Sequence, residues 1–248
     1  MRQFVQHFII PLARKRGWTS FCEIGASTGL STDEILKLPD ISHTIVDPCF
    51  DADLTLKYAG YARVTVQKCN SLDALPNLAG TYDCILIDGD HNWYTVFNEL
   101  RLIRQRGLLR LGGMIFFHDV GWPCGRRDAY YQPNTIPPEY RLEYERKGII
   151  RGRSRLADHG GMNSGIYHAV REGGPRNGVL TAIEDYHTEN LSDYRFCRVR
   201  LQHGLGILQY RRKRTSEDIS FLLLRIKAGI YSLYGFMRRL RKLLFPSH

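Results

Sequence analysis

Five short runs rich in β-branched and aromatic residues recur in the first half of the chain. They are FCEIG (21–25), HTIVD (43–47), RVTVQK (63–68), CILIDGD (84–90) and GMIFFHD (113–119). Stretches with a helical pattern, such as 31–38 and 94–113, stand between them. Apolar strands that alternate with helices are typical of right-handed βαβ units, whose parallel strands form a sheet covered on both faces. The sequence therefore predicts an α/β fold.

The last part of this region has a different pattern. Residues 196–210 consist of two β-rich runs joined by a tight turn, which is typical of an antiparallel hairpin. A parallel sheet closed by a hairpin is an uncommon combination. We therefore expect a Rossmann-like, mostly parallel sheet with an antiparallel C-terminal hairpin.

The chain divides at about residue 210. Residues 1–210 are expected to form one domain, and 211–248 a helical tail. Within the domain, residues 121–176 are rich in Gly, Pro, Arg and Tyr and show little periodicity. Insertions of this length inside a compact domain are usually functional lids or disordered. We expect this one to cover an acceptor site, and 175–187 to form the helix before the hairpin.

The N-terminus and the cysteines bear on localisation. The apolar patch near the N-terminus is interrupted by Pro11 and no small-residue cleavage site follows, so a lead-in helix is expected instead of a signal peptide. No run of 18 apolar residues indicates a membrane-spanning helix. The six cysteines lie far apart without a CxxC pair, which favours buried thiols over disulfides or zinc. A cytoplasmic protein is expected.

The positive charge is concentrated in the tail. Residues 211–248 hold ten Lys and Arg and two acids, a net charge of +8 out of +10 for the whole chain. The body is nearly neutral, so it lacks the wide basic footprint of a nucleic-acid-binding protein. We therefore expect no nucleic acid as partner.

The tail carries a helical stripe of apolar residues with basic residues beside it. Six basic residues interrupt any spanning segment. A helix of this kind lies on a membrane surface or packs against a partner helix. We expect peripheral contact of 216–248 with an anionic membrane, and a homodimer is the alternative. The stripe comprises Leu222, Ile226, Ile230, Leu233, Met237, Leu240 and Leu244, and the basic residues are Arg225, Lys227, Arg238, Arg239, Arg241 and Lys242.

The stretch FCEIGASTGLST (21–32) joins the first run to a helical pattern through glycines and small polar residues. Ligands of open parallel sheets gather at the carboxyl ends of the strands, where this loop would lie. The dinucleotide pattern G-x-G-x-x-G is absent, and the carboxylate of Glu23 would repel a pyrophosphate but could hold an ammonium group. An amino-acid-bearing cofactor fits better than a dinucleotide. The candidate contacts are Glu23, Gly25, Ala26, Ser27, Thr28, Gly29 and Ser31.

Asp47 ends the second β-rich run, where an acid can bind both hydroxyls of a ribose. Such an acid also occurs in NAD enzymes. Together with Glu23 and the hairpin, however, it points to S-adenosyl-L-methionine. Asn70 and Ser71, after the third run, are candidates for adenine contacts, and a plain loop is the alternative.

These motifs resemble a known family. FCEIGASTGLST, HTIVDP, YDCILIDGDHNWYTVFNEL and LLRLGGMIFFHDV are similar to the motifs of class I S-adenosylmethionine-dependent methyltransferases. The branch with IDGDH and HDV motifs, which includes O-methyltransferases of macrolide sugars and other glycans, is the most similar. The resemblance covers roughly residues 15–210 and implies a seven-stranded sheet with an antiparallel last strand.

The resemblance also implies an active site after the fourth and fifth strands. A sugar hydroxyl is a weak acid, so methyl transfer to it needs a base, a metal ion or both. In metal-dependent relatives the matching positions make Asp88 and Asp119 metal ligands and His91 the general base. Asp88 is also expected beside the cofactor, and Asp90 is expected to order the loop or contact the cofactor. For His91, a structural role capping the next helix is the alternative.

His118 departs from the family pattern, which has a carboxylate at this position. Mg²⁺ prefers oxygen ligands, whereas an imidazole suits Mn²⁺ or Fe²⁺ better. His118 is therefore either a ligand of such an ion or no ligand, and Mg or Mn stays a candidate cofactor.

The acceptor is expected to be a hydroxyl on a sugar, glycolipid or glycosylated metabolite. Aromatic rings of 121–176 suit stacking on sugar faces, and arginines suit phosphate or carboxylate. A solvated loop is the alternative for this segment. A nucleic-acid methyltransferase and, less favoured, an NAD(P)-dependent oxidoreductase are the alternative functions. The candidate side chains are Trp122, Tyr130, Tyr131, Arg126, Arg127, Arg151, Arg153 and Arg155.

Overall fold

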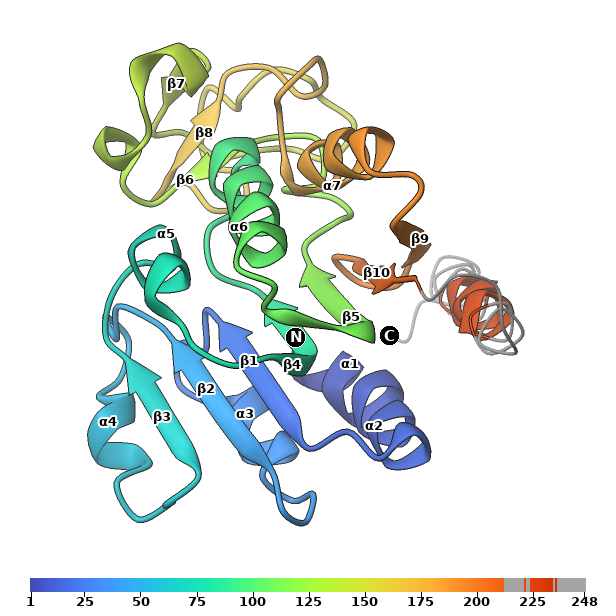
Figure 1. Cartoon of the computed structure of the whole chain (residues 1–248). Coiled ribbons are helices and arrows are strands. Elements are labelled where there is room, and N and C mark those ends of the chain that lie inside the picture. Colours follow the sequence, from blue (N-terminus) through green and yellow to red (C-terminus); the bar gives the residue numbers. More distant parts are fainter. Residues whose placement is uncertain (212–220, 222–223, 234, 236–248) are drawn as a thin grey trace, which may run out of the picture.

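A seven-stranded sheet forms the centre of the computed structural model, which describes residues 1–211, 221, 224–233 and 235. The strand order is β3-β2-β1-β4-β5-β10-β9 (Figure 1). The pairs among β1 to β5 are parallel, and β10 is antiparallel to both of its neighbours. The expected α/β sheet with an antiparallel hairpin is confirmed. The strands are β1 Ser20–Ile24, β2 Ser42–Val46, β3 Val64–Gln67, β4 Tyr82–Ile87, β5 Leu109–His118, β9 Tyr194–Val199 and β10 Leu205–Tyr210.

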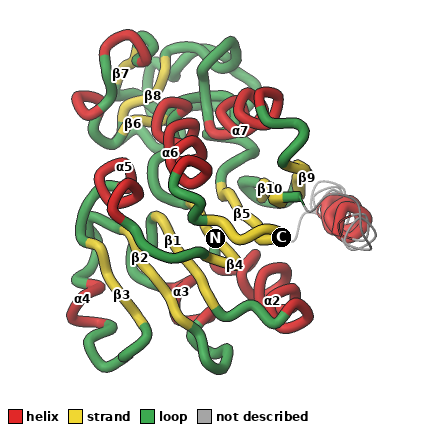
Figure 2. The backbone as a smooth tube through the Cα atoms, viewed as in Figure 1, coloured by secondary structure: helices red, strands yellow, loops and turns green. Residues whose placement is uncertain are grey.

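Helices cover both faces of this sheet (Figures 1 and 2). Alternation along the strands separates two apolar clusters: Ile85 and Ile115 face α5 to α7, whereas Leu86 and Phe116 face the N-terminal helices and α3. The helices are α1 Arg2–Phe4, the π-helix η1 Val5–Ile9, α2 Ile10–Arg16, α3 Leu30–Ile35, α4 Leu54–Lys57, α5 Ser71–Ala74, the 3-10 turn η2 Leu75–Asn77, α6 Trp93–Gln105 and α7 Val179–Glu189.

The helix expected over 94–113 is too long. Helix α6 ends at Gln105, and β5 begins at Leu109, four residues before the expected strand. Gly107, with φ of +63°, turns the chain between them.

The strand order reverses between β1 and β4, because the chain builds β2 and β3 on one side of β1 and then crosses to the other. Loops after these two strands therefore diverge and leave a crevice at the carboxyl edge of the sheet. The residues of the candidate active site come from this carboxyl edge of the sheet.

The inserted segment forms a small second sheet over that edge (Figure 1). Its strand order is β6-β8-β7, and both pairs are antiparallel. Buried Asp128 ties it to the helices: its carboxylate accepts hydrogen bonds from the backbone N–H groups of Trp93 and Gly178 and from the Tyr130 hydroxyl. The added elements are β6 Ala129–Tyr130, the 3-10 turns η3 Pro133–Thr135 and η4 Pro138–Tyr140, β7 Tyr144–Glu145 and β8 Tyr167–Ala169.

The six cysteines form no disulfide. In the described residues, no helix has the length and apolar character needed to cross a membrane. Of the apolar tail stripe, Leu222, Met237, Leu240 and Leu244 lie outside the described residues, as do the basic residues Arg238, Arg239, Arg241 and Lys242.

Candidate active site

A cavity of about 730 Å³ occupies the crevice between β1 and β4. Its wall combines the two loops after these strands with the loop after β2, the start of α5 and three residues of the insertion. A volume of this size suits a small molecule or cofactor. The lining residues are Ile24, Gly25, Ser27, Val46, Asp47, Pro48, Phe50, Asp51, Asn70, Ser71, Leu72, Asp73, Asp88, Gly89, Asp90, Thr95, Tyr131, Gln132 and Thr135.

Gly25 brings the β1 and β4 loops together. Its φ is +81°, and a Cβ placed on it would lie 2.4 Å from the Cα of Gly89. Only a residue without a side chain allows this approach of the two backbones. Gly25 and Gly89 therefore form the part of the cavity wall where β1 and β4 end side by side.

Asp47 holds the glycine loop in place. One carboxylate oxygen accepts hydrogen bonds from the backbone N–H groups of Ala26 and Ser27, both at 2.8 Å, and the other accepts one from Cys49 at 2.6 Å. Asp47 is buried yet lines the cavity. With about two acceptor sites on each oxygen, the oxygen that binds Ala26 and Ser27 is fully used and the other retains one site. The expected contact with ribose hydroxyls stays a prediction.

Glu23 lies behind the cavity and not in its wall. Its carboxylate is 1% exposed, accepts a hydrogen bond from the Thr32 hydroxyl and lies 3.2 Å from Nε2 of His43. The expected direct contact of Glu23 with a cofactor ammonium group is thus not available in this arrangement. Of the other expected contacts, Gly25, Ser27, Asn70, Ser71 and Asp88 line the cavity, whereas Ala26, Thr28, Gly29 and Ser31 do not.

Gly29 packs closely against Tyr58. A Cβ at this position would lie 2.2 Å from the Tyr58 hydroxyl, which donates a hydrogen bond to the Gly29 carbonyl. The second glycine therefore serves packing against Tyr58.

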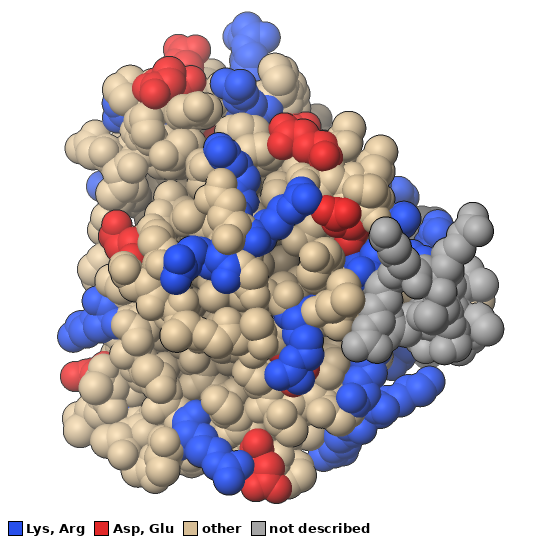
Figure 3. Space-filling view, in the orientation of Figure 1, with Lys and Arg blue, Asp and Glu red and all other residues tan. Residues whose placement is uncertain are grey.

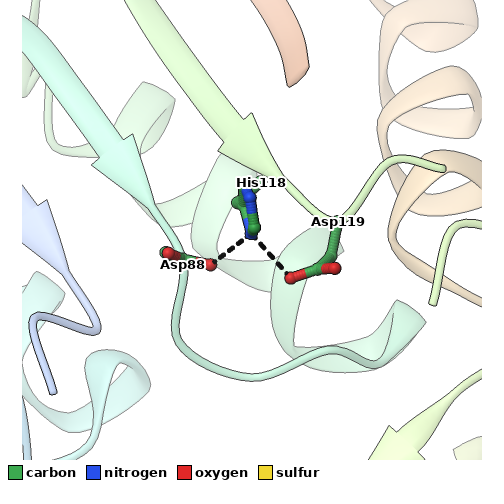
Figure 4. Close-up of side chains that lie close together, drawn as sticks. All are labelled: Asp88, His118 and Asp119. Carbon is green, nitrogen blue, oxygen red and sulfur yellow. Dashed lines mark hydrogen bonds and ion pairs between the residues drawn. The ribbon is translucent and has the colours of Figure 1, made fainter. Parts of the chain in front are cut away.

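The ends of β4 and β5 bring the carboxylates of Asp88 and Asp119 to the imidazole of His118 (Figure 4). The imidazole of His91 joins them through Asp119. Nδ1 of His118 lies 3.1 Å from Oδ1 of Asp88 and 2.8 Å from Oδ2 of Asp119. Nε2 of His91 lies 2.9 Å from the same Asp119 oxygen. Asp88, which also lines the cavity, joins this cluster to it. The expected juxtaposition of IDGDH and HDV residues is present.

The cluster is electrostatically paired. Burial acts to lower the pKa of His118, but contacts with Asp119 and Asp88 outweigh it and raise that pKa to about 9. The pKa of His91 lies well above its ordinary value for the same reason. Burial acts to raise the pKa of Asp88 and of Asp119, yet the histidines hold both well below their ordinary range.

Asp119 adopts a strained conformation, with φ of +56°. This turns the chain sharply after β5 and places the carboxylate between the two histidines. Backbone strain of this kind is concentrated at functional sites.

The cluster can supply ligands to a divalent ion. One donor atom from each of Asp88, His118 and Asp119 lies within 4.8 Å of the others. Two oxygens and one nitrogen suit Mn²⁺ or Fe²⁺ better than Mg²⁺. The donor set therefore fits a transition metal, with His118 contributing the nitrogen.

Several neighbours of this cluster were not placed there from the sequence, among them the N-terminal ammonium of Met1, 3.3 Å from Asp88. The Phe4 ring packs against His118 at 5.8 Å between centroids, and His203, from the hairpin turn, lies 3.8 Å from Asp119 through Nδ1. The Tyr131 hydroxyl lies 3.1 Å from Nδ1 of His91. Phe4 and His203 belong to no sequence motif that contains the cluster residues. Only the fold brings them to this edge of the sheet.

Part of the insertion has a structural role instead of the expected acceptor contacts. Tyr130 is buried, and Arg127 is 1% exposed with its guanidinium donating to the backbone carbonyls of Ala169 and Ser154. Arg126 pairs with Glu184, and Arg151 stacks on Trp122. Tyr131, which is 52% exposed, remains free to stack.

Comparison with known proteins agrees with this architecture. Residues 22–120 match the model of a family described as a methyltransferase domain. The S-adenosylhomocysteine-bound methyltransferase PaMTH1 of Podospora anserina is 15% identical, with a TM-score of 0.50 over 83% of this chain and 77% of that one. The chain has the methyltransferase fold.

A second structure with this fold is Rv0187 from MTB, determined with cofactor bound. It is 17% identical, with a TM-score of 0.50 over 86% of this chain and 82% of that one. No curated protein matches the sequence. At these sequence identities the similarity establishes the methyltransferase fold alone. The reaction has to be inferred from the geometry of the site.

Proposed function

We propose that the chain transfers a methyl group from S-adenosyl-L-methionine to a hydroxyl of a sugar, glycolipid or glycosylated metabolite. The observation that carries this proposal is the position of Asp88, which lines the cavity and belongs to the charged cluster. A cofactor in the cavity would present its methyl group to an acceptor at the cluster. The methyltransferase-domain match over 22–120 supports the same cofactor.

His91 is the proposed general base. In the transfer, the acceptor oxygen attacks the methyl carbon, the carbon–sulfur bond breaks, and S-adenosylhomocysteine leaves. With its proton on Nδ1 and donated to the Tyr131 hydroxyl oxygen, His91 would present an unprotonated Nε2. In the structure this nitrogen lies 2.9 Å from Asp119, so it would have to turn from that carboxylate to accept the acceptor's proton. Tyr131 would thus select the productive tautomer.

Asp88, Asp119 and His118 would hold a divalent ion. When bound, the ion supplies positive charge beside the acceptor oxygen and, by offsetting the two carboxylates, lowers the pKa of His91. This matters because a protonated His91 cannot accept a proton.

The acceptor class is supported by the opening of the site. Tyr131 presents an exposed ring beside His91, and aromatic rings bind the apolar faces of sugars. Its neighbours Gln132 and Thr135 add polar groups to the same wall. These side chains would position a hydroxyl-bearing acceptor without requiring a charged one.

The test is label transfer from methyl-tritiated cofactor into sugar-bearing extracts, with purified protein. His91→Ala should lower turnover by roughly a hundredfold or more while leaving S-adenosylhomocysteine affinity unchanged. His7→Ala, which removes an exposed histidine outside the site, is the matched control and should retain full turnover.

Two outcomes would contradict parts of the proposal. Undiminished transfer by His91→Ala would remove this residue from the mechanism. Transfer that resists a chelator, together with an active Asp119→Ala variant, would exclude the metal role.

A further inference from the structure

The helix over 224–233 has two apolar faces, and only one of them packs on the body. Phe221, Leu224 and Ala228 are buried in the cluster formed with the N-terminal helices and the hairpin. The Tyr231 ring joins this face and lies 4.7 Å from the Phe8 ring, edge-on. These positions repeat at three or four residues and form the inner face.

Polar contacts fix the rotation of the helix about its axis. Lys227 donates to the carbonyl of His7 at 3.3 Å and lies over the Phe8 ring. The backbone N–H of Arg200 donates to the Ser232 hydroxyl at 2.8 Å. Lys227 and Ser232 hold the helix on either side of the inner face. The face opposite the inner face therefore points away from the body.

That outer face is also apolar. Ile226, Ile230 and Leu233 are 51%, 61% and 62% exposed. At about 100° per residue they fall within roughly 60° of one another, nearly opposite the inner face. Gly229, beside the stripe, also has open space around it. Together with the exposure of the three side chains, this shows that nothing in the described chain covers the stripe. Scattered exposed leucines are ordinary, but an aligned stripe marks an interaction surface.

Charge indicates what this surface binds. Arg225 lies exposed on the flank of the stripe, and the segment 211–248 carries a net charge of +8. Lys and Arg side chains also gather over α2, below the tail in the view of Figure 3. An apolar stripe with Arg225 on its flank, in a segment of net charge +8, matches an anionic lipid surface, where each basic residue near the surface contributes about 1 kcal/mol. A dimer would bring these like charges together.

We propose that the outer face, defined as Ile226, Ile230 and Leu233, binds peripherally to anionic membranes. The three side chains enter the boundary between headgroups and acyl chains, and Arg225 faces the phosphates. The inner face stays packed on the body, so the domain need not rearrange to bind. This inference is independent of the reaction proposed above.

Vesicle sedimentation of the full chain tests the proposal. Wild type should sediment with phosphatidylcholine vesicles that contain about one third phosphatidylserine, and only weakly with phosphatidylcholine alone. A triple variant with Ile226→Ser, Ile230→Ser and Leu233→Ser should bind about tenfold or more weakly. Its melting temperature should match wild type, because all three side chains are exposed.

The matched control replaces three exposed leucines away from the tail by serine: Leu56→Ser, Leu111→Ser and Leu191→Ser, which start 75%, 46% and 54% exposed. This control should sediment like wild type. Absence of wild-type binding, or equal binding by both triple variants, would overturn the proposal. So would a wild-type dimer that becomes monomeric in the tail variant without any vesicle binding, which would assign the face to a second copy.

Discussion

Among the single residues of the cavity, Asp47 has the most definite consequence. Its carboxylate accepts three backbone N–H groups and still faces the cavity. Asp47→Ala should therefore weaken S-adenosylhomocysteine binding by about 1–3 kcal/mol, since the loop donors lose their acceptor. Calorimetry measures this. Asp158→Ala, which removes an exposed acid of the insertion, serves as control, and an unchanged affinity for Asp47→Ala would refute the assigned role.

Glu99 makes a prediction about stability and pH. It is fully buried on α6, and both carboxylate oxygens lack a hydrogen-bond partner among the described residues. Burial raises its pKa from 4.5 to about 8. A raised folded-state pKa means that its contribution to stability is complete below pH 4.5 and is lost as pH rises toward 8.

Glu99→Gln removes this dependence, so the free energy of unfolding of the variant relative to wild type should increase between pH 5 and 8. The slope should approach about 1.4 kcal/mol per pH unit. Urea unfolding at several pH values measures it. A difference that stays flat across this range would show that Glu99 is ionised in the fold.

The sequence predicted the positions of residues that directly follow a strand. Asp47, Asp88 and Asp119 follow strands, and parallel strands end at one edge, so their convergence was predictable. The contacts of Glu23 with Thr32 and His43 could not be predicted, because they depend on tertiary packing.

At the scale of elements, Asp128 connects the insertion to two helices. It accepts from the first N–H of α6 and from the residue preceding α7, as well as from the Tyr130 hydroxyl. Asp128→Ala leaves three buried donors without an acceptor and should lower the free energy of unfolding by about 3 kcal/mol or more. Asp128→Asn, which keeps one acceptor oxygen, should lose less. Equal stability of both variants and wild type in urea unfolding would contradict this account.

The elements of the main sheet could be predicted, whereas those of the insertion could not. The apolar β-rich runs and the hairpin turn predicted the strands, although β5 begins four residues before the expected start. The two- and three-residue strands of the insertion are too short to show a period. Buried side chains such as Arg127 hold that segment together in place of an apolar pattern.

For the whole molecule, the tail was only half understood from its sequence. The stripe through Ile226, Ile230 and Leu233 was recognised, but the second apolar face that packs on Phe8 was not. Both faces have helical spacing, and only the fold distinguishes the one that the body covers. The distinction matters because it leaves the stripe available to an external surface.

The central claim, that the crevice between β1 and β4 is a site for S-adenosyl-L-methionine, is tested most directly by calorimetry with the wild-type protein. The account predicts that S-adenosylhomocysteine binds with one site per chain and that NAD and NADP do not bind. Equal binding of a nicotinamide dinucleotide, or no binding of S-adenosylhomocysteine, would contradict it.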